Sequence, residues 1–205
     1  MPNQTFHHLP NDKKERIIQA IIDEFSIHTF EHINLSNIVR ASQIPRGSFY
    51  QYFEDKKDVF DFVYAYIGQI KMKFIGDILN PNHDMPFLKR FESIYVAGLD
   101  FASSYPKLMK AGQKMMASEI FKEHDMMKKA TDQAIEFYGN FIRSDQDKGL
   151  IRSNLDPVLL ASVMIEFSNQ VSLSEYMKDT IDRQHVEMKV KGLIDLIQKG
   201  IEPNV

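Results

Sequence analysis

The stretch IPRGSFYQYFEDKKDVF, residues 44–60, holds five aromatic side chains among seventeen residues. It also places a glycine beside an arginine and a pair of lysines near its end. On a helix, Phe49 and Phe53 lie four residues apart on one face, where both rings can pack inward. The opposite face carries small or amide side chains: Gly47, Ser48 and Gln51. The segment therefore predicts a short helix with an apolar anchor and an exposed polar face.

The polar face has the side chains that read a DNA groove. Gly47 and Ser48 let the helix backbone approach bases closely. The amide of Gln51 can both donate and accept at a base edge, and Arg46 can reach a guanine or a phosphate. The phenols at the edges of this face suit phosphate oxygens. These are Tyr50 and Tyr52.

The neighbouring residues complete a helix-turn-helix. A short helix is predicted from Leu35 to about Ser42, with Asn34 as its N-cap, and a turn at Gln43 and Ile44 joins it to the helix of residues 46–53. Lys56 falls in the first turn of the next helix. There its ammonium and the free backbone N–H groups can face a phosphate together.

Residues 13–60 resemble the DNA-binding domain of the TetR-family transcriptional regulators. The resemblance rests on RIIQAIIDEF (16–25), on HTFEHINLSNIVRAS (28–42) and on the run of glycine, serine, aromatic and tyrosine within 44–60. The stretch KGLIRSNLDP (148–157) is also similar to a junction common before the penultimate helix of such proteins. The resemblance implies that the following residues contact DNA: Asn34, Arg46, Gly47, Ser48, Tyr50, Gln51, Tyr52 and Lys56.

Three positions depart from the family pattern. Gln43 stands where the family usually has a turn glycine, and a glutamine in a left-handed turn costs about 1 kcal/mol relative to glycine. Pro45 replaces a capping serine, although its fixed φ can start a helix. Thr29 replaces a frequent glycine at the end of the first helix. We expect a slightly altered turn before the helix that carries Arg46.

The whole chain predicts an all-α fold of about nine helices, because apolar residues recur at intervals of three and four and alternating strand patterns are missing. Asp55 and Asp156 are predicted N-caps, and Gly149 and Gly200 predicted helix ends. The first expected helix begins near residue 11 or 12 and ends between His28 and His32. Beyond it and the helices of 35–42 and 46–53, the expected helices cover residues 55–79, 87–103, 106–116, 118–148, 157–177 and 181–199.

Composition indicates one soluble protein of 205 residues with a net charge of −3 and no cysteine. No signal peptide and no apolar run long enough to span a membrane is visible, so we expect a cytoplasmic protein. Residues 1–60 hold seven basic against eight acidic side chains, which makes any electrostatic footprint on DNA small and focused. His28 and His32 lie four apart, but no carboxylate motif accompanies them, and we expect no metal and no cofactor.

Methionine and aromatic side chains accumulate between Phe87 and Met177. Each of them suits an ordinary core, while together they suit an adaptable apolar cavity, and in the TetR family this region holds a small-molecule pocket. Polar residues within VMIEFSNQVSL could orient a ligand or lie at a dimer seam, and the sequence does not decide between these. The expected pocket residues are Phe91, Tyr95, Leu99, Met109, Met116, Phe121, Tyr138, Phe141, Met164 and Phe167.

The last two helices carry apolar residues over wide faces, so one side can pack on the subunit and the remainder on a second copy. In the family these helices form a two-fold dimer interface. The residues expected at this interface are Leu160, Val171, Val186, Val190, Leu193 and Ile197.

The resemblance implies a DNA-binding domain over residues 1–55 and an effector-binding and dimerisation domain over 56–205. The expected protein is a homodimeric repressor that binds a palindromic double-stranded operator and is released by a small apolar or amphipathic effector. A ligand-binding module of the same fold without operator binding is the alternative. A helical enzyme is not expected, because the sequence lacks a metal constellation, a cysteine nucleophile and a glycine-rich phosphate loop.

Overall fold

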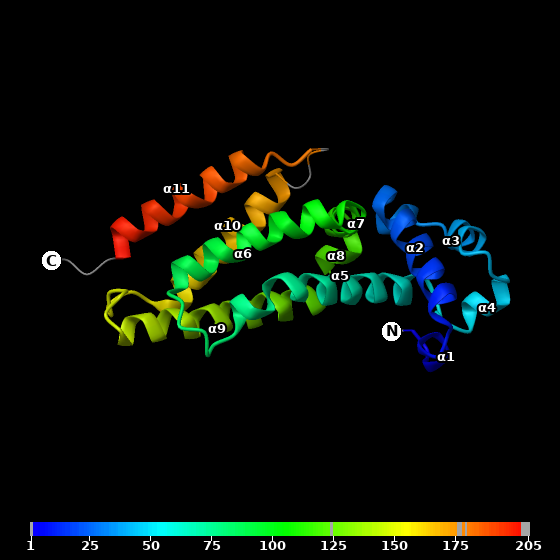
Figure 1. The fold of residues 1–205 in the computed structure, drawn as a ribbon, viewed down its shortest axis with the longest axis horizontal. Helices are drawn as coiled ribbons and strands as arrows, with labels where there is room; N and C mark the ends of the chain where they lie inside the picture. Colours follow the sequence, from blue (N-terminus) through cyan, green and yellow to red (C-terminus); the bar gives the residue numbers. More distant parts are fainter. Residues whose placement is uncertain (1, 124, 176–177, 179, 202–205) are drawn as a thin grey trace. The chain divides into compact units, whose positions relative to one another are not determined.

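The computed structural model describes residues 2–123, 125–175, 178 and 180–201, and these confirm an all-α fold (Figure 1). Its described part contains eleven α-helices and one short 3-10 helix, η1. Their bounds are α1 Gln4–His7, α2 Asn11–Ile27, η1 Phe30–His32, α3 Leu35–Ala41, α4 Arg46–Tyr50, α5 Lys56–Leu79, α6 Phe87–Ser104, α7 Pro106–Met116, α8 Glu119–Glu123, α9 Asp125–Asp147, α10 Pro157–Glu175 and α11 Arg183–Ile201.

The number of helices exceeds the nine expected for two reasons. Helix α1 was not anticipated, because only four residues form it. The single helix expected over 118–148 is described as α8 and α9, with residue 124 between them outside the described part. Helix α11 continues through Gly200 to Ile201, so the expected end at Gly200 is wrong. Met177, the expected end of the preceding helix, lies outside the described residues.

Three acidic or amide side chains start helices as the sequence predicts. The Oδ1 atom of Asn34 accepts a hydrogen bond from the backbone N of Ser36 at 2.9 Å. The Oδ1 atom of Asp55 accepts from Asp58 N at 2.8 Å, and Asp156 Oδ1 accepts from Val158 N at 2.9 Å. Each bond satisfies a backbone donor that the first turn leaves free, so α3, α5 and α10 begin where their caps lie.

The chain divides into two compact units, and each is described here by itself. The first comprises the described residues of 1–73 and 101–123, and the second those of 74–100 and 124–205. Helices α5 and α6 each contribute residues to both units.

The first unit is built around α2, which packs against α3 and α7. Its buried side chains follow the helical spacing of the sequence, with Ile17, Ile21 and Phe25 on the inner face of α2. Aromatic rings complete this core. Phe6 of α1 lies 5.2 Å from the ring centroid of Phe53, which in turn lies 5.2 Å from that of Phe49. Helix α1 thus covers the end of α4.

The second unit contains α9 packed against α10 and an aromatic cluster on α6 and α9. The guanidinium of Arg90 lies at its edge, fully buried, 4.1 Å above the ring centroid of Phe141. Its Nη1 and Nη2 atoms donate to backbone carbonyls in the last turn of α5 and in the segment after it. These belong to Ile78, Asn80, His83 and Met85.

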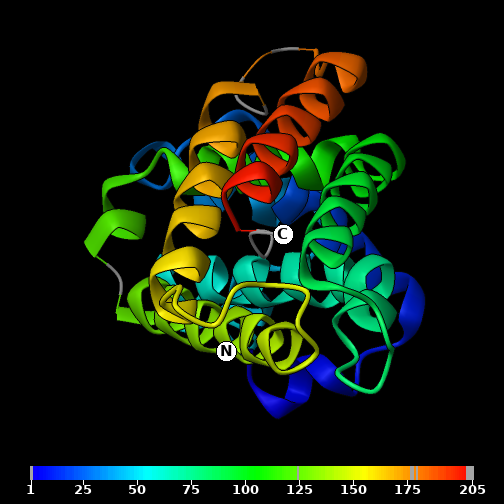
Figure 2. The same cartoon turned by 90° about the vertical axis from the view of Figure 1, so that its left-hand side faces the viewer.

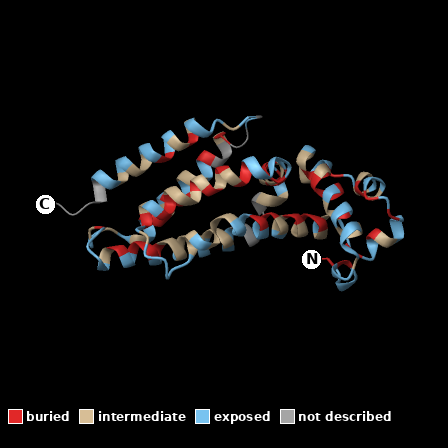
Figure 3. Ribbon diagram, in the orientation of Figure 1, coloured by how far each residue is buried: buried red, intermediate tan, exposed pale blue. Residues whose placement is uncertain are grey.

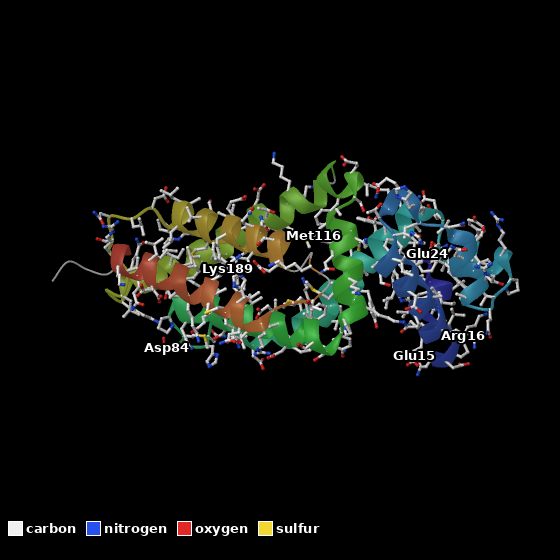
Figure 4. All side chains as sticks on the ribbon, turned by 90° about the horizontal axis from the view of Figure 1, so that it is seen from above. Glu15, Arg16, Glu24, Asp84, Met116 and Lys189 are labelled. Carbon is white, nitrogen blue, oxygen red and sulfur yellow. The ribbon has the colours of Figure 1, made fainter. Side chains whose placement is uncertain are left out.

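A buried carboxylate joins the end of α10 to α11. Glu175 accepts hydrogen bonds from the ammonium groups of Lys178 and Lys189 (Lys189 is labelled in Figure 4), and the Nε2 atom of His185 lies 3.5 Å from its Oε1 atom. The two lysine hydrogen bonds lower the pKa of Glu175 to about 2. This cluster fixes the N-terminal half of α11.

Candidate nucleic-acid interface

Helices α3 and α4 form the helix-turn-helix that the sequence predicts. Ile38 and Phe49 are fully buried and anchor the two helices on their inner sides. The turn between them contains Gln43 with φ +54°, the only positive φ of a non-glycine residue among those described. The left-handed turn is therefore confirmed at the position where the sequence lacks the usual glycine.

We predict that the substitution Gln43→Gly stabilises the protein by about 1 kcal/mol, because glycine adopts the left-handed conformation without the steric cost of a Cβ. The side chain of Gln43 is exposed, so little packing is lost. Urea unfolding of the variant and the wild type measures the difference. A destabilised variant would show that the glutamine side chain contributes more than the strain it imposes.

Helix α2 holds α3 at both ends through polar side chains. Glu24, labelled in Figure 4, accepts from the backbone N of Asn34 at 2.9 Å and from the amide of Asn37 at 3.3 Å. At the other end, Arg16 Nε donates to the carbonyl of Ser42 at 3.1 Å. Nothing in the neighbouring residues indicates these contacts, because Glu24 and Arg16 lie within an ordinary amphipathic pattern.

The exposed face of α4 carries the side chains expected to read bases. Arg46, Gly47 and Gln51 are exposed, Ser48 is half-buried, and 42% of the Tyr50 surface is accessible. A Cβ added to Gly47 would meet nothing within 4 Å, so the backbone there is open to close approach. The side chains of Arg46 and Gln51 make no hydrogen bond with any described residue. They therefore remain available to a ligand.

Tyr52 and Asn34 are placed differently from the other expected contacts. Only 5% of Tyr52 is exposed, its ring centroid lies 6.0 Å from that of Phe6, and the ammonium of Lys13 lies 5.7 Å from it. Little of this phenol is accessible to a phosphate. Asn34 is exposed, but its Oδ1 atom already caps α3, which leaves its amide N as the group free to donate.

Lys56 supports the segment before α3 as well as the start of α5. Its ammonium donates to the carbonyl of Glu31 at 3.1 Å and to that of Ile33 at 3.4 Å, and lies 4.8 Å from the ring centroid of Phe30. An ammonium has three N–H donors, so one remains for a phosphate. Lys56 thus has a structural contribution that its motif did not indicate.

The junction of α7 and α8 contacts the same segment. The Oγ atom of Ser118 accepts from Phe30 N at 2.9 Å, and Glu31 Oε1 accepts from Glu119 N at 2.9 Å. Ser118 is fully buried and also donates to the carbonyl of Lys114. Within the first unit, η1 is therefore hydrogen-bonded to the junction that precedes α8.

The expected pocket residues are distributed over both units. Met109, Met116 and Phe121 belong to the first unit and the other seven to the second. In the second unit, burial raises the pKa of Tyr138 to about 12. Tyr95 and Leu99 line a small cavity of about 80 Å³, together with Val186 and Val190 of α11. The remaining expected residues of this unit pack in its aromatic and apolar core. They are Phe91, Phe141, Met164 and Phe167.

The expected dimer residues lie mainly on the inner faces of α10 and α11. Leu160, Val171, Val186 and Val190 are buried within the subunit, and Leu193 and Ile197 are half-buried. Other apolar side chains of these helices are exposed. Figure 3 colours much of the α11 ribbon pale blue, the colour of exposed residues. The exposed apolar residues are Val158, Leu159 and Val163 on α10 and Met188 and Leu196 on α11.

No group of three or more histidine, cysteine, aspartate or glutamate side chains in the described part of the chain could hold a metal ion. None of the described helices is long and apolar enough to cross a membrane.

Comparison with known proteins identifies the fold. No family model and no curated protein matches the sequence. Several solved structures have a similar fold. A TetR-family transcriptional regulator from Chloroflexus aurantiacus aligns over 100% of both chains with a TM-score of 0.68 and 21% identity. The fatty acid degradation regulator FadR from Bacillus halodurans aligns over 94% of this chain and 97% of its own, with a TM-score of 0.72 and 18% identity.

A third similar structure is FadR from Bacillus subtilis in complex with stearoyl-CoA, which has a TM-score of 0.71 and 14% identity. The alignment covers 92% of this chain and 99% of that one. The chain therefore has the fold of the TetR-family transcriptional regulators, as its helix-turn-helix motif predicted.

Proposed function

We propose that this protein is a transcriptional regulator that binds double-stranded DNA as a homodimer. The observation that carries the proposal is the exposed face of α4, where Arg46, Gly47 and Gln51 stand free on a helix anchored by Phe49. Such a helix fits the major groove, with its first residues at the base edges. The phosphates on either side of the groove are then faced by Asn34, Tyr50 and Lys56. Ser48 lies between the bases and the DNA backbone.

A mobility shift with DNA that flanks the protein's own gene tests this function. We expect a retarded complex at low salt, whose affinity falls steeply as salt rises, because phosphate contacts release counterions. Unrelated DNA of equal length serves as the control. If neither DNA is retarded at low salt, the protein is a ligand-binding module of the same fold and the regulator proposal fails.

The dimer is proposed to form through the exposed apolar residues of α10 and α11. Leu159 and Val163 lie four residues apart on α10 and share a face, and 58% of Met188 and 71% of Leu196 are exposed on α11. Solvated apolar residues of this size on adjacent helices are typical of an interface. A two-fold axis there would relate two copies of α4, as binding to a palindromic operator requires.

The substitution Leu196→Glu is expected to weaken the dimer at least about a hundredfold, because a carboxylate must lose water at a closed apolar interface. The monomer should keep its fold, since Leu196 is exposed. Sedimentation equilibrium measures both properties, and Gln184→Glu, exposed on the same helix, is the matched control. A wild type that is monomeric at micromolar concentration would contradict the proposed dimer, and unchanged association of the variant would exclude this face.

The effector is proposed to be small and amphipathic and to release the operator by a population shift. To change the ratio of the two conformations from 99:1 to 1:99, the effector must bind the favoured conformation more tightly than the other by about 5.5 kcal/mol. The complex of the Bacillus subtilis regulator with stearoyl-CoA supports a ligand with a long apolar chain. Helix α5 is the proposed lever, because it begins at Lys56 and ends in the second unit. Within the first unit, the hydrogen bonds of Ser118 and Glu119 to residues 30 and 31 join the junction of α7 and α8 to the segment before α3.

A further inference from the structure

A cavity of about 370 Å³ lies in the second unit, apart from all ten expected pocket residues. Its walls come from the start of α6, the connection between α9 and α10, and the C-terminal half of α11, segments that Figure 2 shows from the end of the bundle. Apolar side chains form much of the lining: Leu88, Leu150, Ile151 and Ile194. The volume falls within the usual range of small-molecule sites.

Asp145 is a buried acidic residue of this cavity, and only one of its two carboxylate oxygens accepts a hydrogen bond from the described part of the chain. Only 4% of the residue is exposed, and its Oδ2 atom accepts a hydrogen bond from the backbone N of Phe87 at 2.6 Å. Its Oδ1 atom has no hydrogen-bond partner in the described part of the chain, although Asp145 lines the cavity. Oδ1 retains contact with solvent, so a ligand in the cavity can reach it, and a donor from that ligand would replace water at this oxygen.

The charges around the cavity favour a donor over an anion. Lys89 on its wall is paired with Glu92 at 2.7 Å, and Lys148 near Asp145 is paired with Asp84 at 2.7 Å. The guanidinium of Arg90 interacts electrostatically with Asp145, but its Nη atoms donate to four carbonyls instead. No unpaired cation among the described lining residues is left to bind a carboxylate ligand.

We propose that this cavity binds a small apolar molecule that carries a hydrogen-bond donor, with an ammonium group preferred, and that Asp145 Oδ1 accepts a hydrogen bond from this donor. Charge-assisted hydrogen bonds are about twice as strong as neutral ones, so an amine should bind more tightly than the matching alcohol. The apolar body would contact Ile151 and Ile194. This site is independent of the proposed function, because it needs neither DNA nor the effector cavity.

Nuclear magnetic resonance titration of the free, isotope-labelled protein with benzylammonium, benzyl alcohol and benzoate tests the proposal. We expect shifts at the backbone amides of Phe87, Leu150 and Ile151, since the Phe87 N–H reports on the carboxylate of Asp145. Benzylammonium should bind at least about tenfold more tightly than benzoate, with benzyl alcohol between them. Shifts of equal size with benzoate, or no shift at these amides with any probe, would overturn the assignment.

Two variants sharpen the result. Asp145→Asn keeps the volume and an oxygen for the Phe87 N–H, but can place an N–H donor where Oδ1 stands, so it should reverse the preference between ammonium and benzoate. Ile194→Phe should fill the cavity and weaken all three probes, because it removes volume without touching Asp145. Retained ammonium preference in Asp145→Asn, or unchanged binding in Ile194→Phe, would place the probe elsewhere and contradict the proposal. Folding of each variant is read from the same amide spectra.

Discussion

The substitution Gly47→Glu is expected to abolish specific DNA binding without harming the fold. Position 47 is exposed, and nothing lies within 4 Å of an added Cβ, so the new side chain can be accommodated. It would place a negative charge on the face of α4 that is proposed to approach the phosphates and bases. Juxtaposed like charges cost several kcal/mol, and about 3 kcal/mol corresponds to roughly a hundredfold loss of affinity.

Gly47→Ala is the matched control, because it adds the same Cβ without the charge. Replacing a helix glycine by alanine stabilises by about 0.5–1 kcal/mol, so both variants should unfold at urea concentrations equal to or above that of the wild type. Fluorescence anisotropy with a bound DNA fragment measures affinity. A Gly47→Glu protein that binds as well as Gly47→Ala would show that α4 does not enter the groove.

The substitution Arg90→Ala is expected to destabilise the second unit by about 3 kcal/mol or more. It removes the donors of four backbone carbonyls at and after the end of α5 and the cation over Phe141, and leaves a void where a large side chain was buried. Arg90→Lys keeps the positive charge but not the planar guanidinium with its several N–H donors, so we expect an intermediate loss of stability.

Hydrogen exchange of residues 78–90, combined with urea unfolding, measures the effect of Arg90→Ala. Exchange should accelerate in this segment, while the amides of α2 and α3 in the first unit keep their protection. If the free energy of unfolding falls by less than about 1 kcal/mol, water replaces the guanidinium at the carbonyls without penalty, and the expected role of Arg90 is wrong.

The sequence predicted those features that depend on residues close together in the chain. The caps Asn34, Asp55 and Asp156 bond to backbone groups two or three residues away, and the strained turn at Gln43 depends on that residue's own φ. The exposed face of α4 also follows from local spacing, because Phe49 and Phe53 must turn inward.

Other features depend on distant partners and could not be predicted. Glu24 and Arg90 are buried polar groups whose acceptors or donors are set by tertiary packing, and nothing in their own segments distinguishes them from surface charges. Asp145 was missed for the same reason, because Phe87 lies 58 positions away.

The faces of α10 and α11 are a further feature that the spacing of apolar residues in the sequence does not predict. Both helices carry apolar residues on more than one side, so spacing alone does not reveal which side packs inward. Val186 and Val190 are buried in the subunit, whereas Met188 and Leu196 are exposed. The residues available to a partner were therefore identified only from the packed structure.

Selection of bound duplexes from a random DNA library tests the central claim most directly, because it needs no knowledge of the operator. A dimer that presents two copies of α4 should enrich an inverted repeat whose half-sites lie about one helical turn, roughly 10 base pairs, apart or a little more. Gly47→Glu protein should enrich nothing under the same conditions. Recovery of an inverted repeat by the wild type alone is the predicted result. Failure of the wild type to enrich any sequence at low salt would contradict the account.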